Sequence, residues 1–329
     1  MSLEQLLEWY ETHKRDLPFR KSRDAWAILV SEIMLQQTRV EAVLHSYLRF
    51  MERYPSPREF ALATEEEILE IWQGLGYYRR VRMLHQAAQK LASRPLPQKA
   101  EEWQKLPGVG DYTAAAVASI AQNEAVVVLD GNVERVASRY FGLNHRARSR
   151  RERQVYKDAL NQDLLDFKHP DLSNQALMEL GALVCLPKNP RCADCPLQPR
   201  CYASLYDLQE HFPPKKAPVE FEEIQLYVLL RVREGQLETV GTGFRGYQPG
   251  FLHLPYLEHS RELRKEEILE GFGISDFQIL GSFRHSITRY RIQVQVITEK
   301  GADFSGIGEF FGVFSTIMKK ALKIARIGL

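Results

Sequence analysis

A proline-rich segment separates two parts of the sequence that differ in hydrophobic periodicity. Residues 212–218 contain three prolines and two lysines, a composition typical of linkers because proline cannot continue a helix and favours extended backbone. Before this segment apolar residues recur every three or four positions, as in helices, whereas after it they alternate with polar residues, as in strands. We therefore expect a mainly α unit over residues 1–211, a linker over 212–222 and an α+β unit over 223–329.

The composition excludes disordered and membrane-spanning proteins. With 329 residues, 44% of them hydrophobic and 26% charged, the chain is ordinary for a folded protein with two cores. No apolar run is long enough to cross a membrane, and the first 14 residues have the pattern of an amphipathic helix rather than a signal peptide. The net charge of +2 says little about partners, although arginines cluster locally, as between residues 146 and 153. A cytoplasmic location is the expectation.

All four cysteines lie in one short segment, at Cys185, Cys192, Cys195 and Cys201. Two disulfides would be uncommon in a cytoplasmic protein, and the close spacing favours four thiolates that converge on one point. Four thiolates suit both tetrahedral zinc and an iron–sulfur cluster. The residues by themselves leave both possibilities open.

A turn that contains two glycines, Leu106–Gly110, lies between helices expected at 100–105 and 113–121. Gly108 and Gly110 allow the backbone to turn tightly and to expose amides at the start of the second helix, an arrangement that binds phosphate regardless of base sequence. Most turns of this kind only connect two helices, so the turn alone is weak evidence for nucleic-acid binding.

Two carboxylates differ from their surroundings. Glu32 has the apolar neighbours Ile28 and Leu35 one turn away on an expected helix, and desolvation there should raise its pKa and keep a proton available near neutral pH. Asp130 precedes Gly-Asn-Val-Glu-Arg and is a strong candidate for a helix N-cap, which should hold it ionised. Both residues also have plain explanations, as a surface glutamate and as a cap without further role.

Three segments resemble the endonuclease III and MutY superfamily of DNA glycosylases. They are the C-x₆-C-x₂-C-x₅-C spacing, the run that begins at Leu106 and reads L-P-G-V-G-x-Y-T-A, and Ser31–Thr38, which is similar to the catalytic segment of MutY-type adenine glycosylases. The resemblance implies a helix-hairpin-helix fold with a six-helix domain at about 23–130 and a cluster domain formed by 1–22 and 131–211. It also implies a [4Fe–4S] cluster on the four cysteines.

The same resemblance assigns roles to the residues of an active site. Glu32 would protonate N7 of an extruded adenine, and Asp130 would stabilise the cationic sugar, as paired carboxyls do in glycoside hydrolysis. Tyr112 stands where bifunctional relatives have a Schiff-base lysine, so we expect base removal without efficient strand cleavage.

Access to a base inside a duplex requires its extrusion, and several segments resemble parts of the family that perform it. The expected DNA contacts are Gln37, Thr38, Leu75, Gly76, Tyr77 as the wedge, Gly108, Val109, Gly110, and Lys188 and Arg191 inside the first cysteine loop. The positions similar to the base pocket are Arg15, Arg20, Asn132 and Gln175. An amide can pair with an adenine edge, although Gln175 replaces an acidic residue that is usual in the family.

The C-terminal unit resembles the MutT-like domain with which MutY enzymes recognise 8-oxoguanine opposite adenine. It lacks the glutamate and glycine spacing of an active Nudix hydrolase. Residues 283–290 align with the recognition hairpin, and His285, Thr288 and Arg289 are the expected contacts. The family usually has Phe-Ser-His where this chain has Ile-Thr-Arg at 287–289; Thr288 keeps a hydroxyl, whereas Arg289 adds a permanent charge.

The sequence thus predicts a monofunctional adenine glycosylase that acts on duplex DNA with A:8-oxoG or A:G mispairs. We expect a cytoplasmic, nucleoid-associated monomer without a membrane partner. A mismatch thymine or uracil glycosylase of the same superfamily is the first alternative. A non-catalytic protein that binds DNA damage on the same scaffold is the second.

Overall fold

The computed structural model describes residues 2–215, 220–241, 245, 252–287, 289–304 and 315–327. The chain forms two compact units, Met1–Lys216 and Ala217–Leu329, and each is described by itself. The division falls inside the segment 212–222 that the sequence marks as a linker. Within the described segments no helix is both long and apolar enough to span a membrane.

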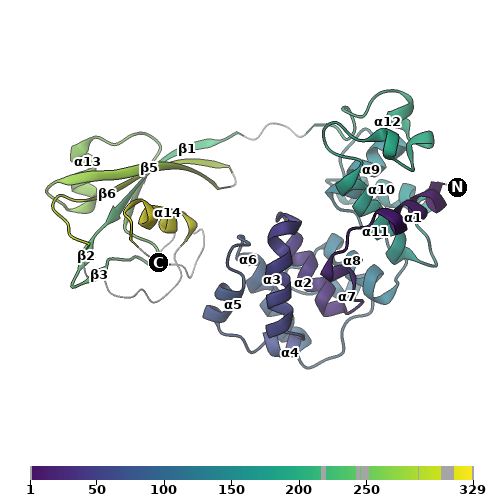
Figure 1. The fold of residues 1–329 in the computed structure, drawn as a ribbon, viewed down its shortest axis with the longest axis horizontal. Coiled ribbons are helices and arrows are strands. Elements are labelled where there is room, and N and C mark those ends of the chain that lie inside the picture. The colour runs from purple at the N-terminus through teal and green to yellow at the C-terminus, as the bar shows by residue number, and fades with distance from the viewer. Residues whose placement is uncertain are drawn as a thin grey trace. The chain divides into compact units, whose positions relative to one another are not determined.

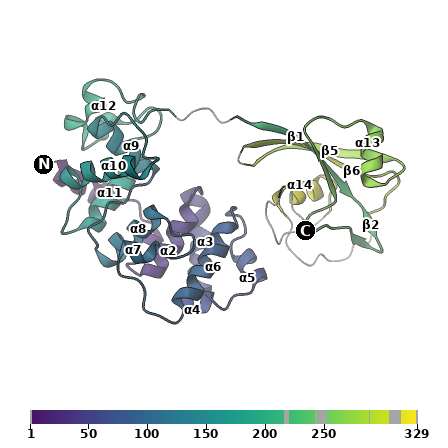
Figure 2. The same ribbon diagram turned by 180° about the vertical axis from the view of Figure 1, so that it is seen from behind.

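The first unit is helical, which confirms its expected fold class (Figures 1 and 2). Asp24 caps α2 by accepting a hydrogen bond from the amide of Ala27 at 2.7 Å, and Thr64 and Ser149 form capping boxes at α5 and α10. The helices are α1 (Ser2–His13), α2 (Ala25–Leu35), α3 (Val40–Arg53), α4 (Pro57–Phe60), α5 (Glu65–Ile71), α6 (Arg79–Leu91), α7 (Ala100–Trp103), α8 (Asp111–Gln122), α9 (Gly131–Phe141), α10 (Arg150–Asp163), α11 (Pro170–Leu183) and α12 (Tyr202–Leu205), with 3₁₀ turns η1 (Pro18–Arg20), η2 (Cys192–Asp194) and η3 (Gln198–Arg200).

Helix α2 lies at the centre of one half of the helical unit. It packs on α3, α6 and α8, and every residue from Ala25 to Met34 is buried. Trp26 contacts Phe50 and Phe60 in an aromatic cluster with ring centroids 6.3 and 6.0 Å from the indole. A helix that is buried all round desolvates any charged group that it carries.

The other half of the helical unit has its own core, to which α1, α9, α10 and α11 contribute side chains such as Trp9, Val136, Tyr156 and Leu177. Cys185, Cys195 and Cys201 pack against this core, so the cysteine segment at the end of the helical unit is attached to it. Helix α11 contacts both α8 and α9 and thereby joins the two halves.

The second unit is α+β, as expected. Its main sheet has the order β4-β1-β6-β5, in which β1 runs parallel to β6 and the other neighbours are antiparallel. Leu226 and Val228 of β1 pack with α14, while Tyr227 and Leu229 pack with α13. The elements are β1 (Glu222–Leu230), β2 (Val232–Arg233), β3 (Gln236–Leu237), β4 (Tyr256–His259), α13 (Lys265–Phe272), β5 (Phe277–Ile287), β6 (Tyr290–Glu299) and α14 (Thr316–Ile324).

Local boundaries in the second unit differ from the sequence-based expectation. The alternation of apolar and polar residues from Leu237 onward predicts a longer strand, whereas the described residues up to 241 form β3 and an isolated bridge between Val240 and His253. The hairpin expected at 283–290 is formed by β5 and β6, with Ile287 opposite Tyr290. Thr288 lies outside the described residues.

Candidate active site

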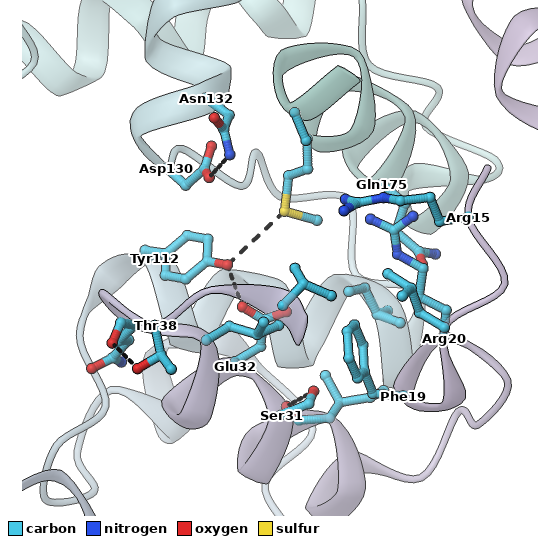
Figure 3. A pocket seen from close by; sticks show the side chains of 18 of the residues that line it. Arg15, Phe19, Arg20, Ser31, Glu32, Thr38, Tyr112, Asp130, Asn132 and Gln175 are labelled. Atoms are coloured by element: carbon cyan, nitrogen blue, oxygen red, sulfur yellow. Dashed lines mark hydrogen bonds between the residues drawn. The ribbon is translucent and has the colours of Figure 1, made fainter. Parts of the chain in front are cut away.

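A cavity of about 580 Å³ is lined by residues from both halves of the helical unit (Figure 3). Its volume lies within the range of about 300–1,000 Å³ that is usual for small-ligand sites. The expected site residues that line it are Arg15, Arg20, Glu32, Gln37, Thr38, Tyr112, Asp130, Asn132 and Gln175. The structure therefore brings together the three predicted catalytic residues and all four predicted base-pocket residues.

Glu32 is buried in this cavity with 7% of its surface exposed. Desolvation by burial raises the pKa of its carboxyl from 4.5 to about 7, although a hydrogen bond from Tyr112 opposes the shift. Partial desolvation was expected from the apolar neighbours of Glu32; the structure buries it further because every residue of α2 from Ala25 to Met34 is buried. A carboxyl with this pKa holds a transferable proton near neutral pH.

Tyr112 lies in the first turn of α8 and donates its hydroxyl hydrogen to Oε2 of Glu32. Burial, followed by the nearby charges of Glu32 and Asp130, raises the pKa of the phenol well above 10.0. The hydroxyl therefore stays protonated and remains a donor toward the glutamate. Figure 3 shows the two side chains pointing toward one another.

Asp130 is the N-cap of α9, as the sequence predicted. Its Oδ1 accepts a hydrogen bond from the amide of Val133 at 2.7 Å, and its Oδ2 accepts one from Nδ2 of Asn132 at 3.0 Å. The expectation that capping decides its charge needs a correction, because burial raises the pKa of Asp130 and outweighs the opposite effect of these hydrogen bonds. Burial in the cavity and the hydrogen bonds of the N-cap therefore shift the pKa of Asp130 in opposite directions.

Asn132 is held by a residue that the sequence reasoning missed. Nη2 of Arg135 donates to Oδ1 of Asn132 at 2.9 Å and to the carbonyl of Gly181 at 2.7 Å, while its Nε donates to the carbonyl of Cys185 at 2.7 Å. The backbone of α11 approaches closely here, since a Cβ on Gly181 would lie 2.6 Å from Cβ of Asn132. The i, i+3 spacing of Asn132 and Arg135 was the available signal.

The predicted pocket residues Arg15 and Arg20 share a partner that was also missed. Nε and Nη2 of Arg15 lie 2.9 and 2.8 Å from the two carboxylate oxygens of Glu179, and Nη2 of Arg20 lies 2.7 Å from Oε2. Burial alone would raise the pKa of Glu179, but the two guanidinium groups lower it to about 2. Gln175 accepts a hydrogen bond from Tyr10 at 3.4 Å, so its amide is partly used within the protein.

The predicted DNA-contacting loops beside the cavity contain unusual backbone. Gln37 and Tyr77 have φ of 56° and 49°, in the left-handed region that non-glycine residues seldom adopt. Gln37 is exposed, and the Tyr77 side chain is 52% exposed, as a wedge requires. The side chain of Leu75 is 5% exposed and packs inward, and its amide donates to the carbonyl of Trp72 at 3.2 Å, so Leu75 is a poor candidate for a DNA contact.

The hairpin between α7 and α8 forms as expected, with one correction. Gly108 has φ of 77°, and a Cβ on it would lie 2.8 Å from Cβ of Met83, so glycine is required. Val109 is buried and its amide donates to the carbonyl of Leu106 at 3.2 Å; neither its side chain nor its N–H is free for phosphate. The first-turn amides of α8, which follow Gly110, have no partner within the helix and are the better donors.

The four cysteines are free and line one small cavity. Nη1 of Arg139, a buried residue that the sequence did not single out, lies 3.4 Å from Sγ of Cys185. Within the described segments no three His, Cys, Asp or Glu side chains form a group that could hold a metal ion as placed. The donor set, four thiols without disulfides around one space, fits either zinc or an iron–sulfur cluster in its chemistry. Lys188 and Arg191 are exposed in this segment.

The predicted opposing-base residues belong to the second unit. Nδ1 of His285 lies 3.4 Å from Nζ of Lys320, and burial together with that charge lowers the pKa of His285. Nη2 of Arg289 donates to the hydroxyl of Tyr290 at 3.2 Å. These two residues lie at or beside the end of the β5–β6 hairpin, whose Thr288 the structure does not describe.

The family model that matches residues 30–161 is described as "HhH-GPD superfamily base excision DNA repair protein". The chain is 44% identical over 210 residues to the adenine DNA glycosylase of Rattus norvegicus and 43% identical over 210 residues to that of Homo sapiens, in each case over 60% of this chain. It covers 40% and 38% of the length of these two relatives. Identity to the adenine DNA glycosylase of Mycolicibacterium smegmatis is 42% over 198 residues, or 59% of this chain and 66% of the relative.

Solved structures resemble the chain over a similar share of its length. A thermostable thymine-DNA glycosylase matches with a TM-score of 0.57 and 26% identity, over 62% of this chain and 95% of that one. A trapped endonuclease III–DNA covalent intermediate matches with a TM-score of 0.53 and 21% identity, over 63% and 95%. The second likeness concerns the fold alone.

Proposed function

The chain belongs, through residues 30–161, to the HhH-GPD superfamily of base excision DNA repair proteins, and we propose that it is a monofunctional adenine DNA glycosylase. Its substrate would be duplex DNA in which adenine is mispaired with 8-oxoguanine or guanine. The observation that carries the proposal is Glu32, a buried carboxyl with a pKa of about 7 in a cavity shared with Asp130 and Tyr112. The named relatives are adenine DNA glycosylases, which supports the same substrate.

The proposed reaction uses the protonated form of Glu32 and the ionised form of Asp130. Glu32 donates its proton to N7 of the extruded adenine, and the bond between C1′ and N9 breaks with its electron pair going to the base. The ionised form of Asp130 stabilises the resulting sugar cation, as one carboxylate does in glycoside hydrolysis. Water then adds to C1′ and returns a proton to a carboxylate. Tyr112 holds the Glu32 carboxyl in place through its hydroxyl.

The absence of an amine at position 112 argues for hydrolysis over strand cleavage. A bifunctional enzyme needs a lysine that forms a Schiff base with the sugar, and a protonated phenol cannot do this. Tyr112→Lys should therefore introduce some adduct that borohydride traps. A folded variant with no trapped adduct would count against a position beside the sugar.

Binding to DNA would use both the hairpin and the exposed loops. The first-turn amides of α8 suit a phosphate, and Lys188 and Arg191 are exposed cations that suit the backbone. Tyr77 would fill the space that the extruded adenine leaves. The second unit would read the opposing 8-oxoguanine through the β5–β6 hairpin, with His285, Thr288 and Arg289 as contacts.

We propose that the four cysteines hold a [4Fe–4S] cluster, which would order the segment that carries Lys188 and Arg191. Arg139 would place a positive charge beside Cys185, where thiolate ligands carry negative charge. Iron and sulfide analysis of the purified protein tests this assignment. Stoichiometric zinc without iron would replace it with a zinc site.

Single-turnover assays on duplexes with A:8-oxoG, A:G, A:C and T:G pairs test the function. Adenine release that is fastest from A:8-oxoG is expected. Thymine release from T:G would favour the first alternative, which the likeness to a thymine-DNA glycosylase structure makes worth including. Binding without release of any base would favour the second. We propose a cytoplasmic, nucleoid-associated location because the proposed substrate is DNA. We also propose that the protein is a monomer, and light scattering of the full chain tests this.

A further inference from the structure

Arg80 bridges two segments that are far apart in sequence. It lies in the first turn of α6, and its Nη1 faces the carboxyl end of α2. There it donates to the carbonyls of Ile33 at 2.8 Å and Met34 at 3.1 Å, and to that of Gln36. The last carbonyls of a helix have no partner within the helix, and a cation near them also opposes the negative end of the helix dipole.

The other terminal nitrogen of Arg80 faces the loop before α6. Nη2 donates to the carbonyls of Leu75 at 3.0 Å and Gly76 at 3.3 Å, and to Oγ1 of Thr38 at 3.0 Å. Nε1 of Trp72 reaches the same carbonyl of Gly76 at 3.0 Å. One guanidinium group therefore holds two loops, with one nitrogen turned mainly to each.

Each of these loops contains a non-glycine residue in the left-handed region, Gln37 with φ of 56° and Tyr77 with φ of 49°. Such conformations persist only where surrounding contacts fix them. Both residues directly adjoin an acceptor of Arg80, since Gln37 follows Gln36 and Tyr77 follows Gly76. The guanidinium also lies 5.4 Å from the centre of the Tyr77 ring, close enough for a cation–π contact.

We propose that Arg80 is a positioning residue for base extrusion: it fixes Gln37 and Tyr77 in the conformations that enter the DNA stack and ties both to the helix that carries Glu32. The inference rests on the proposed function and deepens it. Arg80 touches no substrate in this role. It keeps the wedge and the acid in one fixed relation.

The chemistry of the site requires arginine rather than a cation in general. Six acceptors are spread over two nitrogens of a planar fork, whereas a lysine ammonium offers three donors from a single point. Burial lowers the pKa of Arg80 to about 10, so the group is still charged at neutral pH. Arg80→Lys keeps the charge and should nevertheless lose part of the bridge.

The matched control is Arg49→Lys. Nη2 of Arg49 also donates to carbonyls at the end of a helix, those of Glu70 at 3.4 Å and Ile71 at 3.1 Å, but it touches neither loop. The same substitution therefore removes the same kind of contact from a place without a proposed role. Both variants are made in the full-length protein.

Hydrogen–deuterium exchange of the free protein is the first measurement. In Arg80→Lys, amides at 36–38 and 75–78 should exchange faster, while the cores of α8 and α11 keep their protection; Arg49→Lys should leave the two loops unchanged. Unchanged loops in Arg80→Lys, or faster exchange throughout the helical unit, would overturn the proposal. This readout needs no DNA, so it decides the bridge even if no duplex proves to be a substrate.

Extrusion and catalysis are measured next. With 2-aminopurine at the target position and Glu32→Gln as background, Arg80→Lys should reduce the fluorescence rise on binding. With Glu32 present, single-turnover adenine release should slow by about tenfold or more, while duplex affinity changes by less than about threefold, because phosphate contacts are elsewhere. A rate loss matched by an equal loss of affinity, or no rate loss, contradicts the assignment.

Chemical rescue guards against a folding defect. Arg80→Ala leaves a space for a free guanidinium ion, and millimolar guanidinium should restore part of the rate, whereas sodium chloride at equal ionic strength should not. Equal effects of the two salts would mean that the fork geometry is irrelevant, and would overturn the proposal.

Discussion

Two buried glutamates of the helical unit, Glu32 and Glu179, have pKa values shifted in opposite directions. Glu32 is 7% exposed and has a pKa of about 7, whereas Glu179 is 0% exposed and has a pKa of about 2. Burial alone would raise the pKa of both carboxyls. The difference between them arises from the residues that each carboxyl contacts. A phenol hydroxyl cannot compensate for lost hydration of a carboxylate, but the guanidinium groups of Arg15 and Arg20 can.

The two glutamates therefore have different roles, although they are the same residue type. Glu32 stores a proton that a reaction can consume. Glu179 never takes up a proton near neutral pH, and it fixes the two arginines that line the cavity. Arg20 acts on both glutamates, since it pairs with Glu179 and its charge also acts to lower the pKa of Glu32. Partners rather than depth decide which buried carboxyl is chemically useful.

Replacing the proton donor should have the largest effect. Glu32→Gln is expected to reduce adenine release by about 10²–10⁴-fold, the usual contribution of a general acid, with duplex affinity nearly unchanged because no phosphate contact is lost. Single-turnover rates and a binding titration measure the two quantities. Near-normal adenine release would show that Glu32 is not the proton donor. The contrast between Glu32 and Glu179 would then have no functional meaning.

Replacing the other glutamate should damage stability more than chemistry. Glu179→Gln leaves two partly buried guanidinium groups without their carboxylate, and the expected loss in the free energy of unfolding is about 3 kcal/mol. Urea unfolding of the full chain measures it. A variant as stable as the wild type would mean that Arg15 and Arg20 are hydrated and that the ion pairs matter little.

The two residues should also give stability opposite pH dependences. The pKa of Glu32 rises on folding from 4.5 to about 7, so its contribution is complete below pH 4.5 and is lost as the pH rises to about 7. The pKa of Glu179 falls from 4.5 to about 2, so its contribution is complete above pH 4.5 and is lost toward pH 2. Each slope approaches about 1.4 kcal/mol per pH unit. The difference in unfolding free energy between wild type and each Gln variant, taken across pH, isolates the two contributions; slopes of equal sign would refute the contrast.

Removing the hydroxyl of Tyr112, the hydrogen-bond partner of Glu32, should have the smallest effect. The hydrogen bond from Tyr112 lowers the pKa of Glu32, so Tyr112→Phe should shift the descending limb of the pH–rate profile from about 7 to higher pH. Wild-type and variant rates measured between pH 5 and 9 on one duplex reveal the shift. A limb that moves to lower pH would show that the phenol does not favour the ionised glutamate.

Much of this site was predictable where one segment carried the information. The burial of Glu32 follows from its apolar neighbours, and the cap at Asp130 follows from the residues after it. The charge of Asp130 was not predictable, because local hydrogen bonds and burial act in opposite directions and only the fold sets their balance. Glu179 was missed since its partners Arg15 and Arg20 lie more than 150 positions away; a lone glutamate in the apolar run of α11 was the signal.

The bridge at Arg80 illustrates a second limit. The sequence predicted both loops as DNA contacts, but it did not indicate that Arg80 connects them. Nothing local shows that its six acceptors come from 33–38 and 75–76. Backbone carbonyls have no sequence signature, so contacts to them emerge only from tertiary structure.

Gly181 is a position in α11 where a common stabilising substitution should fail. Helix interiors generally gain about 1 kcal/mol when glycine becomes alanine, and a search for thermostable variants would favour that exchange in α11. Here the methyl group would lie 2.6 Å from Cβ of Asn132, the side chain that donates to Asp130. Overpacking of this kind typically costs about 1–3 kcal/mol, so Gly181→Ala should lose the gain expected from helix propensity and displace the hydrogen-bond partner of Asp130.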